Sequence, residues 1–250
     1  MASATVTVTM DDAGADPAVN GALARCLEAG ALDCVSVMAS GRHWEEACDM
    51  AGESGLPVSV HLNCVEPPFL TDSDFPGGIL SWTLYASSLA PAARREWRMQ
   101  IERLLSRGLM LTRMDGHRHL HHLPPLREAA LDLAEEYGIR IVRAAVVPPG
   151  DGGLRGLYLR RLGRRLAEGA RARGLAATSL MLGFGRSGRV GKRYLQRAER
   201  LLDSAGLSGD DEVELVMHPA LRPVWSGGQP EELSLLTSDW YGQWSRRNRG

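Results

Sequence analysis

The spacing of apolar residues changes repeatedly along the chain, between short runs typical of buried strands and longer stretches with helical periodicity. Thr5 to Met10 alternates β-branched residues, and Asp16-Pro17 then begins a helix that Gly30 ends. Apolar and amphipathic segments continue to alternate in this way. We therefore expect strands at 5–10, 34–38, 57–61, 109–115, 139–146, 176–182 and 212–217, with helices at 17–29, 44–52, 91–107 and 125–138.

The repeated order of strand and helix is typical of a parallel sheet. About seven such units in 250 residues favour one α/β domain over residues 1–250, with an irregular (β/α) barrel-like fold of about seven parallel strands. An open doubly wound sheet is the alternative. In a barrel the catalytic groups lie where the strands end, and the polar residues that follow strands here are Asp11, Asp12, His61, the histidines after Gly116, and His218.

Charge and composition narrow the classes of partner. The chain has 29 basic and 30 acidic residues and a net charge of −1, so nucleic acid is not an expected partner. No apolar run approaches the roughly 18 residues of a membrane-spanning helix, and the start does not resemble a signal peptide. We expect a cytoplasmic protein without a membrane span, its four cysteines reduced, and a homodimer as the commonest oligomer.

Arginines are concentrated between about residues 148 and 209. Arg160, Arg161, Arg164 and Arg165 have helical spacing, which favours a solvated helix surface. A basic lip for an anionic conjugate is the alternative.

Four of the seven histidines lie within residues 117–122, directly after Asp115-Gly116. In an extended strand His117, His119 and His121 would share one face. Neutral imidazole is the commonest metal ligand in proteins, so this spacing predicts a metal site. A hydrated polar turn is the alternative interpretation.

Asp11 and Asp12 could complete such a site. Adjacent residues at a strand end point to different sides, so one carboxylate can bind a metal while the other faces its bound water. Capping of the next helix is the alternative role for this pair. His61 and His218 each end a further strand, and two histidines with one carboxylate are a familiar metal-hydrolase ligand set.

Four motifs, in this order, make the chain resemble the YdjC-like carbohydrate deacetylases, which include chitooligosaccharide and hopanoid-associated enzymes. They are TMDDAG with PAVNGAL, VHLN, DGHRHLHHLP with EEYGIRIVR, and ELVMHPA. The resemblance implies a barrel-like, metal-dependent N-deacetylase with one divalent ion, zinc or magnesium. The implied substrate is an amino sugar or its conjugate, including lipid-linked and natural-product glycoconjugates.

The resemblance also implies residue roles. Asp12, His61 and His117 would bind the metal, Asp11 would be the base, and His218 the acid. His119 and His121 would support the ligands or contact substrate. From the residues themselves we expect a similar role for Asp115, Asn63 and Arg143. Asp115 is expected to orient a histidine or to cap its strand, and Arg143 to form a salt bridge or bind substrate. A backbone N–H of the Leu62-Asn63 loop is expected to stabilise an oxyanion.

The chain departs from the family pattern at two positions. Ala13 replaces the usual phenylalanine and is expected to leave space beside the base, and Gly116 replaces the usual serine. Two other functions remain open: a metal-dependent hydrolase of another C–N or phosphoester bond, and a non-catalytic sugar-binding protein.

Overall fold

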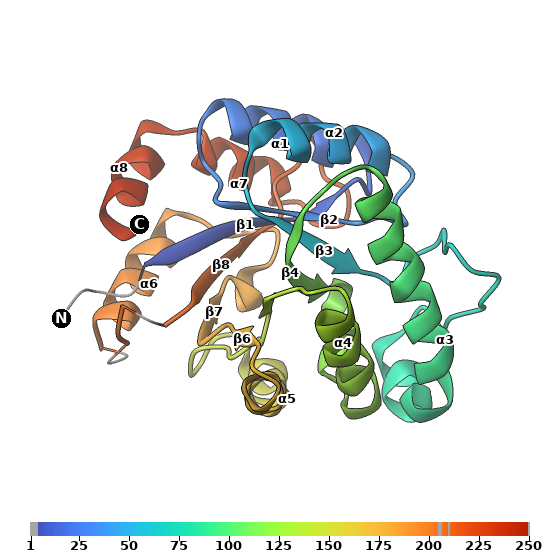
Figure 1. The fold of residues 1–250 in the computed structure, drawn as a ribbon. Coiled ribbons are helices and arrows are strands. Elements are labelled where there is room, and N and C mark those ends of the chain that lie inside the picture. Colours follow the sequence, from blue (N-terminus) through green and yellow to red (C-terminus); the bar gives the residue numbers. More distant parts are fainter. Residues whose placement is uncertain (1–4, 205–206, 210, 250) are drawn as a thin grey trace.

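Eight parallel strands form one sheet in the computed structural model, which describes residues 5–204, 207–209 and 211–249 (Figure 1). The sheet order is β6-β5-β4-β3-β2-β1-β8-β7. The strands are β1 (Val6–Ala13), β2 (Cys34–Val37), β3 (Val58–Leu62), β4 (Leu111–Gly116), β5 (Ile141–Val142), β6 (Ala176–Ala177), β7 (Leu180–Leu182) and β8 (Val213–Met217).

The two edges of this sheet are joined by one short segment. β6 pairs with β5 at one edge and β7 pairs with β8 at the other, yet only Thr178 and Ser179 separate β6 from β7. The Thr178 N–H donates to the carbonyl of Val142, and the Ser179 N–H donates to that of Glu212. The backbone therefore passes from bonding with the β5 edge to bonding with the β8 edge between two successive residues. This brings the two edges together, so the sheet curls toward a barrel. The barrel-like fold is confirmed, and the strand count is eight because the expected strand 176–182 is divided here.

Helices cover the outside of the curled sheet (Figure 1). They are α1 (Pro17–Glu28), α2 (Trp44–Ser54), α3 (Ile79–Ser106), α4 (Pro124–Glu136), α5 (Gly153–Ala172), α6 (Lys192–Ser204), α7 (Gln229–Leu236) and α8 (Asp239–Asn248). Two 3₁₀ helices, η1 (His117–His122) and η2 (Phe184–Arg186), lie in the loops. In the described part of the chain, no helix is both long and apolar enough to span a membrane.

Two sequence-based boundaries were wrong. α3 begins at Ile79 and contains Pro91, which we expected at its first turn. Trp82 and Ala86 are buried on one face of this additional stretch, and their packing outweighs the hydrogen bond that Pro91 cannot donate. β5 is also shorter than the expected strand 139–146. The backbone at Arg143 still bonds to Met114, but the chain then leaves the sheet.

Candidate metal centre

The two adjacent aspartates lie at the distorted end of β1. Asp12 has a φ of 64°, and the register of β1 against β2 shifts between Met10 and Ala13. A left-handed residue in a strand is strained, and such strain is common at functional sites. The distortion directs Asp11 toward Arg143 and Asp12 toward His61 and His117. The two carboxylates therefore have different neighbours, as the sequence suggested.

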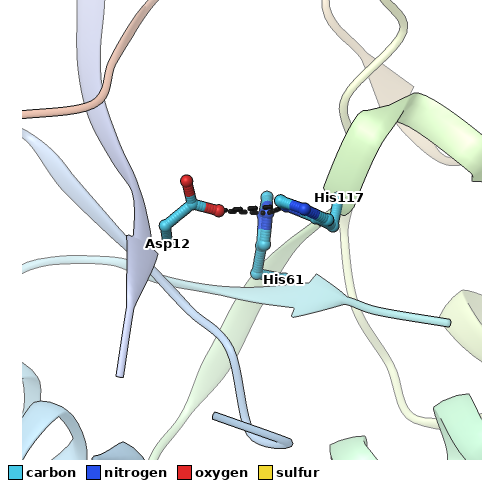
Figure 2. Close-up of side chains that lie close together, drawn as sticks. All are labelled: Asp12, His61 and His117. Carbon is cyan, nitrogen blue, oxygen red and sulfur yellow. Dashed lines mark hydrogen bonds and ion pairs between the residues drawn. The ribbon is translucent and has the colours of Figure 1, made fainter. Parts of the chain in front are cut away.

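Asp12, His61 and His117 converge from the ends of β1, β3 and β4 (Figure 2). Asp12 Oδ1 lies 3.2 Å from His61 Nε2 and 3.1 Å from His117 Nδ1, and the two nitrogens are 3.2 Å apart. A cation about 2.1 Å from each donor would see them at roughly 95 to 100°, between octahedral and tetrahedral values. The donor set and its spacing thus fit one divalent ion. The cluster is one of two in the described chain that could hold a metal.

The second cluster shares His61 and adds Asp11 and Asp115. Asp115 accepts a hydrogen bond from His61 Nδ1. Its other oxygen accepts from Ser36 Oγ at 2.8 Å and Ser59 Oγ at 2.5 Å. Because Nδ1 is bonded to Asp115, the lone pair of His61 Nε2 is directed toward Asp12 and His117. These contacts match the expectation that Asp115 orients a histidine better than a strand-capping role.

Buried Arg143 binds several carboxylates at once. Its guanidinium donates to both oxygens of Asp11, at 2.7 and 2.9 Å, and to both oxygens of Glu214, at 2.8 and 2.9 Å. It also lies 3.3 Å from Asp115. Arg143 is not among the residues that line the cavity beside the donor trio, which is described below. The salt-bridge interpretation of this residue therefore holds.

The charges of this region favour a bound cation. Asp11, Asp12, Asp115 and Glu214 are almost fully buried, and the buried arginines beside them are Arg143 and Arg113. These buried carboxylates outnumber the buried guanidinium groups. Buried negative charge without compensation is costly, so the region favours added positive charge, either as protons on His61 and His117 or as a bound cation.

The pKa shifts of the buried aspartates and histidines reflect the same excess of carboxylates. Burial raises the pKa of Asp12, but the neighbouring His117 and His61 outweigh burial and hold the pKa well below its ordinary value. Burial lowers the pKa of His61, yet Asp115 and Asp12 outweigh it and raise the pKa. The carboxylates therefore attract positive charge to the imidazoles, as a proton or as a metal ion. Burial raises the pKa of Asp11, with Arg143 opposing it.

The histidine cluster does not form the extended strand that we expected. Residues 117–122 form η1, and Arg118 and His119 have positive φ values of 51° and 58°. Of the four histidines, His117 alone reaches the donor trio. The buried His121 bonds through Nε2 to the carbonyl of Arg143, and His122 Nε2 accepts from the N–H of Ala145.

The contacts of Asn63, Ala13 and Gly116 bear on three further expectations from the sequence. The Asn63 N–H donates to Gln100 Oε1 at 2.8 Å, so this amide is not the free oxyanion donor that we expected. The Asn63 side chain bonds to Ser40 and to its own loop. Ala13 is fully buried in the apolar core and does not line the pocket, so the missing phenylalanine opens no space for substrate. A Cβ at Gly116 would lie 2.6 Å from His121 Nδ1.

A cavity of about 440 Å³ opens beside the donor trio. Its wall includes Asp11, His119 and His218, and His218 Nε2 lies 3.8 Å from Asp11 Oδ2. Burial lowers the pKa of His218 below its ordinary value, although Asp11 and Asp12 oppose this shift. Ser187 Oγ lies 3.3 Å from His218 Nδ1. Base and acid candidates thus face the same cavity.

Several residues of the site, some in the cavity wall and some in the buried network behind it, were not found from the sequence. Trp225 donates from Nε1 to Asp12 Oδ2 at 3.2 Å, and its ring contacts that of His218 edge-on. It lies in an irregular loop, where no periodicity indicates direction. The sequence does contain a signal for three of them. A buried polar residue interrupts an apolar run at Glu214, Ser36 and Ser59. The others are Glu66, Ile79, Arg118, Gly152, Arg155, Phe184, Gly185, Ser187 and Arg189.

The structure thus defines an α/β barrel-like protein with a carboxylate and two histidines gathered at the ends of its strands. A sequence model of the YdjC-like protein family matches residues 5–247, and the chain belongs to this family.

Curated relatives agree with the family assignment. Carbohydrate deacetylases from Brevibacillus brevis and Danio rerio are 30% and 27% identical over 143 and 157 residues, which is 54% and 57% of this chain. These matches cover 57% and 50% of the two relatives, so the chain spans about half the length of the curated relatives it matches.

Solved structures support the fold. One from Enterococcus faecalis, described as a cellobiose-phosphate cleavage protein, has a TM-score of 0.70 and 19% identity, covering 99% of this chain and 95% of that one. A lactam utilization protein from Thermus thermophilus has a TM-score of 0.50 and 12% identity, covering 98% and 95%.

Proposed function

We propose that this protein is a metal-dependent hydrolase that removes the N-acetyl group from an amino sugar or an amino-sugar conjugate. The observation that carries the proposal is the trio of Asp12, His61 and His117, whose donor atoms lie 3.1–3.2 Å apart at the wall of a cavity. Asp11 and His218, the base and acid that this reaction needs, line the same cavity. The carbohydrate deacetylases among its relatives support this class of reaction.

One divalent ion held by the trio would polarise the acetamide carbonyl and activate a water molecule. Two nitrogen donors and one oxygen donor favour zinc over magnesium. Asp11 would accept the proton of the attacking water, and Arg143 holds both of its carboxylate oxygens in place. His218 would donate a proton to the departing amine, which is a poor leaving group without it.

The cavity also carries groups suited to a sugar. Trp225 and Phe184 offer aromatic surfaces, and Arg155 and Arg189 offer donors for hydroxyl groups or for an anionic substituent. A volume of about 440 Å³ is within the usual range of small-molecule sites. We propose an N-acetylated amino sugar as the reacting unit, either free or in a lipid-linked or natural-product glycoconjugate.

Acetate release from a panel of N-acetylglucosamine conjugates tests this proposal. The wild type is measured with and without a chelator, beside Asp11→Asn and the surface control Asp72→Asn. We expect chelator-sensitive release that falls by about 10²-fold or more in Asp11→Asn and is unchanged in Asp72→Asn. Activity that survives in Asp11→Asn would remove this residue as the base. Metal-dependent cleavage of a generic phosphoester, with no acetate released, would favour the other hydrolase class.

A further inference from the structure

The large apolar side chains at the surface are distributed unevenly. Of the thirteen that are exposed in the described chain, ten belong to three segments: 79–85 at the start of α3, 154–158 at the start of α5, and 221–225 after β8. Each segment contributes a residue to the wall of the catalytic cavity, namely Ile79, Arg155 and Trp225. Segments that are distant in the sequence therefore meet around one opening, and we call these three segments the apolar rim.

The two helices of the apolar rim begin with unpartnered apolar faces. Leu154, Leu157 and Tyr158 are 85%, 64% and 52% exposed and have the i, i+3, i+4 spacing of one helix face. Leu80 and Leu84 are about 70% exposed and are one turn apart on α3. Contiguous apolar surface of this kind usually marks a contact with another molecule or with a membrane.

Arginines accompany the apolar rim on the α5 side. Arg155 and Arg189 line the opening, and Arg161 is exposed one turn beyond Tyr158 on α5. None of the three forms an ion pair with a described residue. At about 1.5 Å per residue, Arg161 lies roughly 5 to 11 Å further along the helix than the apolar turn. Exposed acids, Asp72 and Asp74, precede α3, so the basic side of the opening is that of α5.

We propose that the apolar rim docks the protein on the surface of an anionic lipid bilayer, with the catalytic cavity facing the headgroups. Apolar residues with a tryptophan and tyrosines form the rim, Arg155 and Arg189 lie at its opening, and Arg161 lies further along α5. This combination of apolar, aromatic and basic groups matches the acyl chains, interface and phosphates of an anionic bilayer. The arginines favour this partner over a purely apolar one such as a second copy of the chain. The inference concerns a surface and does not depend on the reaction in the cavity.

Vesicle binding tests this proposal through Trp225, which is exposed while Trp82, Trp97 and Trp244 are fully buried. With vesicles of phosphatidylcholine and phosphatidylglycerol in equal parts, we expect co-flotation and a blue shift of tryptophan emission. The shift should be smaller in Trp225→Phe, because Trp225 is the tryptophan of the apolar rim, whereas the partly buried Trp44 and Trp240 lie outside it. Vesicles of phosphatidylcholine alone should bind more weakly, by about 5-fold for each arginine at the surface.

Matched variants locate the binding surface. The triple variant Leu80→Ser/Leu154→Ser/Leu157→Ser should weaken vesicle binding on the order of 10²-fold. The control Met99→Ser/Leu105→Ser/Met110→Ser changes the three exposed apolar residues outside the apolar rim and should bind like the wild type. Circular dichroism checks that both remain folded. Arg161→Gln should weaken binding by about 5-fold.

Two results would overturn the proposal. One is the absence of wild-type binding to either type of vesicle. The other is a rim variant that binds vesicles normally but dissociates a dimer in size-exclusion chromatography, which would make the rim an interface between copies. Acetate release from a short, soluble substrate is measured separately. Vesicle binding without acetate release would support the docking surface and count against the deacetylase, so the two proposals fail independently.

Discussion

The two halves of the sheet contribute to the site in different ways. β1 to β4 are strands of four to eight residues, and all three candidate ligands occur within β1 and β3 or directly after β4. β5 to β8 are strands of two to five residues, and their half supplies Arg143, Glu214, His218 and much of the cavity wall. Longer strands therefore fix the positions of the candidate ligands, whereas loops and helix starts shape the cavity around them.

The largest effect is expected in the first half. His61→Ala removes one of three ligand atoms, so metal binding should be lost and acetate release should fall by about 10³-fold or more. Isothermal titration with Zn²⁺ and an acetate assay measure the two quantities. The control is His43→Ala, which changes a histidine outside the trio. Metal bound with wild-type affinity in His61→Ala would show that the trio is not the metal site.

The next effect concerns the contact between the halves. Arg143 follows β5 but binds Asp11 of β1 and lies close to Asp115 of β4. Arg143→Met leaves buried carboxylates unpaired and should lower the free energy of unfolding by about 3–5 kcal/mol, measured in urea. Arg140→Met, an exposed position nearby, should change it by less than about 0.5 kcal/mol. An equally small loss at Arg143 would mean that the network is hydrated or already neutral.

The sequence predicted the first half well. Asp12, His61 and His117 come at or directly after apolar strands, and the ends of adjacent parallel strands meet at one edge, so their proximity follows from the order of elements. The polar residues that support them could also have been found. Ser36 and Ser59 occupy paired positions on β2 and β3, each between two valines.

The second half could not be predicted to the same extent. Trp225 and Ser187 lie in irregular loops, where direction depends on tertiary packing and not on a local period. The prediction that His117, His119 and His121 share one face of a strand was wrong for a related reason. Alternation places His117 and His121 on one face only if the chain is extended, and the positive φ values at Arg118 and His119 break that premise. The division of strand 176–182 between two edges is likewise decided by closure of the sheet.

A smaller loss of activity is expected in the second half. His218→Asn should lower acetate release by about 10²-fold while leaving Zn²⁺ affinity unchanged, because His218 donates a proton and is not a ligand in the trio. An N-acetylated aniline with a nitro group needs less protonation at its nitrogen, so its hydrolysis should fall much less. An equal loss on both substrates would instead indicate a role in binding or in packing against Trp225.

The smallest expected effect is that of adding a side chain at Gly116, at the end of β4. Gly116 has ordinary extended backbone, with φ −158°, so its backbone would accept a serine. The obstacle is the ring of His121, because an added Cβ would lie 2.6 Å from its Nδ1 atom. Gly116→Ser should cost about 1–3 kcal/mol of unfolding free energy through this overlap. Gly52→Ser, whose Cβ would meet its nearest atom at 3.4 Å, should lack this steric cost.

A double-mutant cycle separates this overlap from other effects of the substitution. If His121 is the obstacle, Gly116→Ser should be less costly in a His121→Ala background, with a coupling of about 1 kcal/mol or more. Because Gly116 precedes the candidate ligand His117, Gly116→Ser should also weaken Zn²⁺ binding. Zn²⁺ affinity should then recover together with stability in the double variant. Stability that recovers without metal affinity would show that the serine disturbs the ligand through the backbone and not through His121. In that case the backbone at the end of β4 would determine the position of His117, and the buried His121 would contribute only packing.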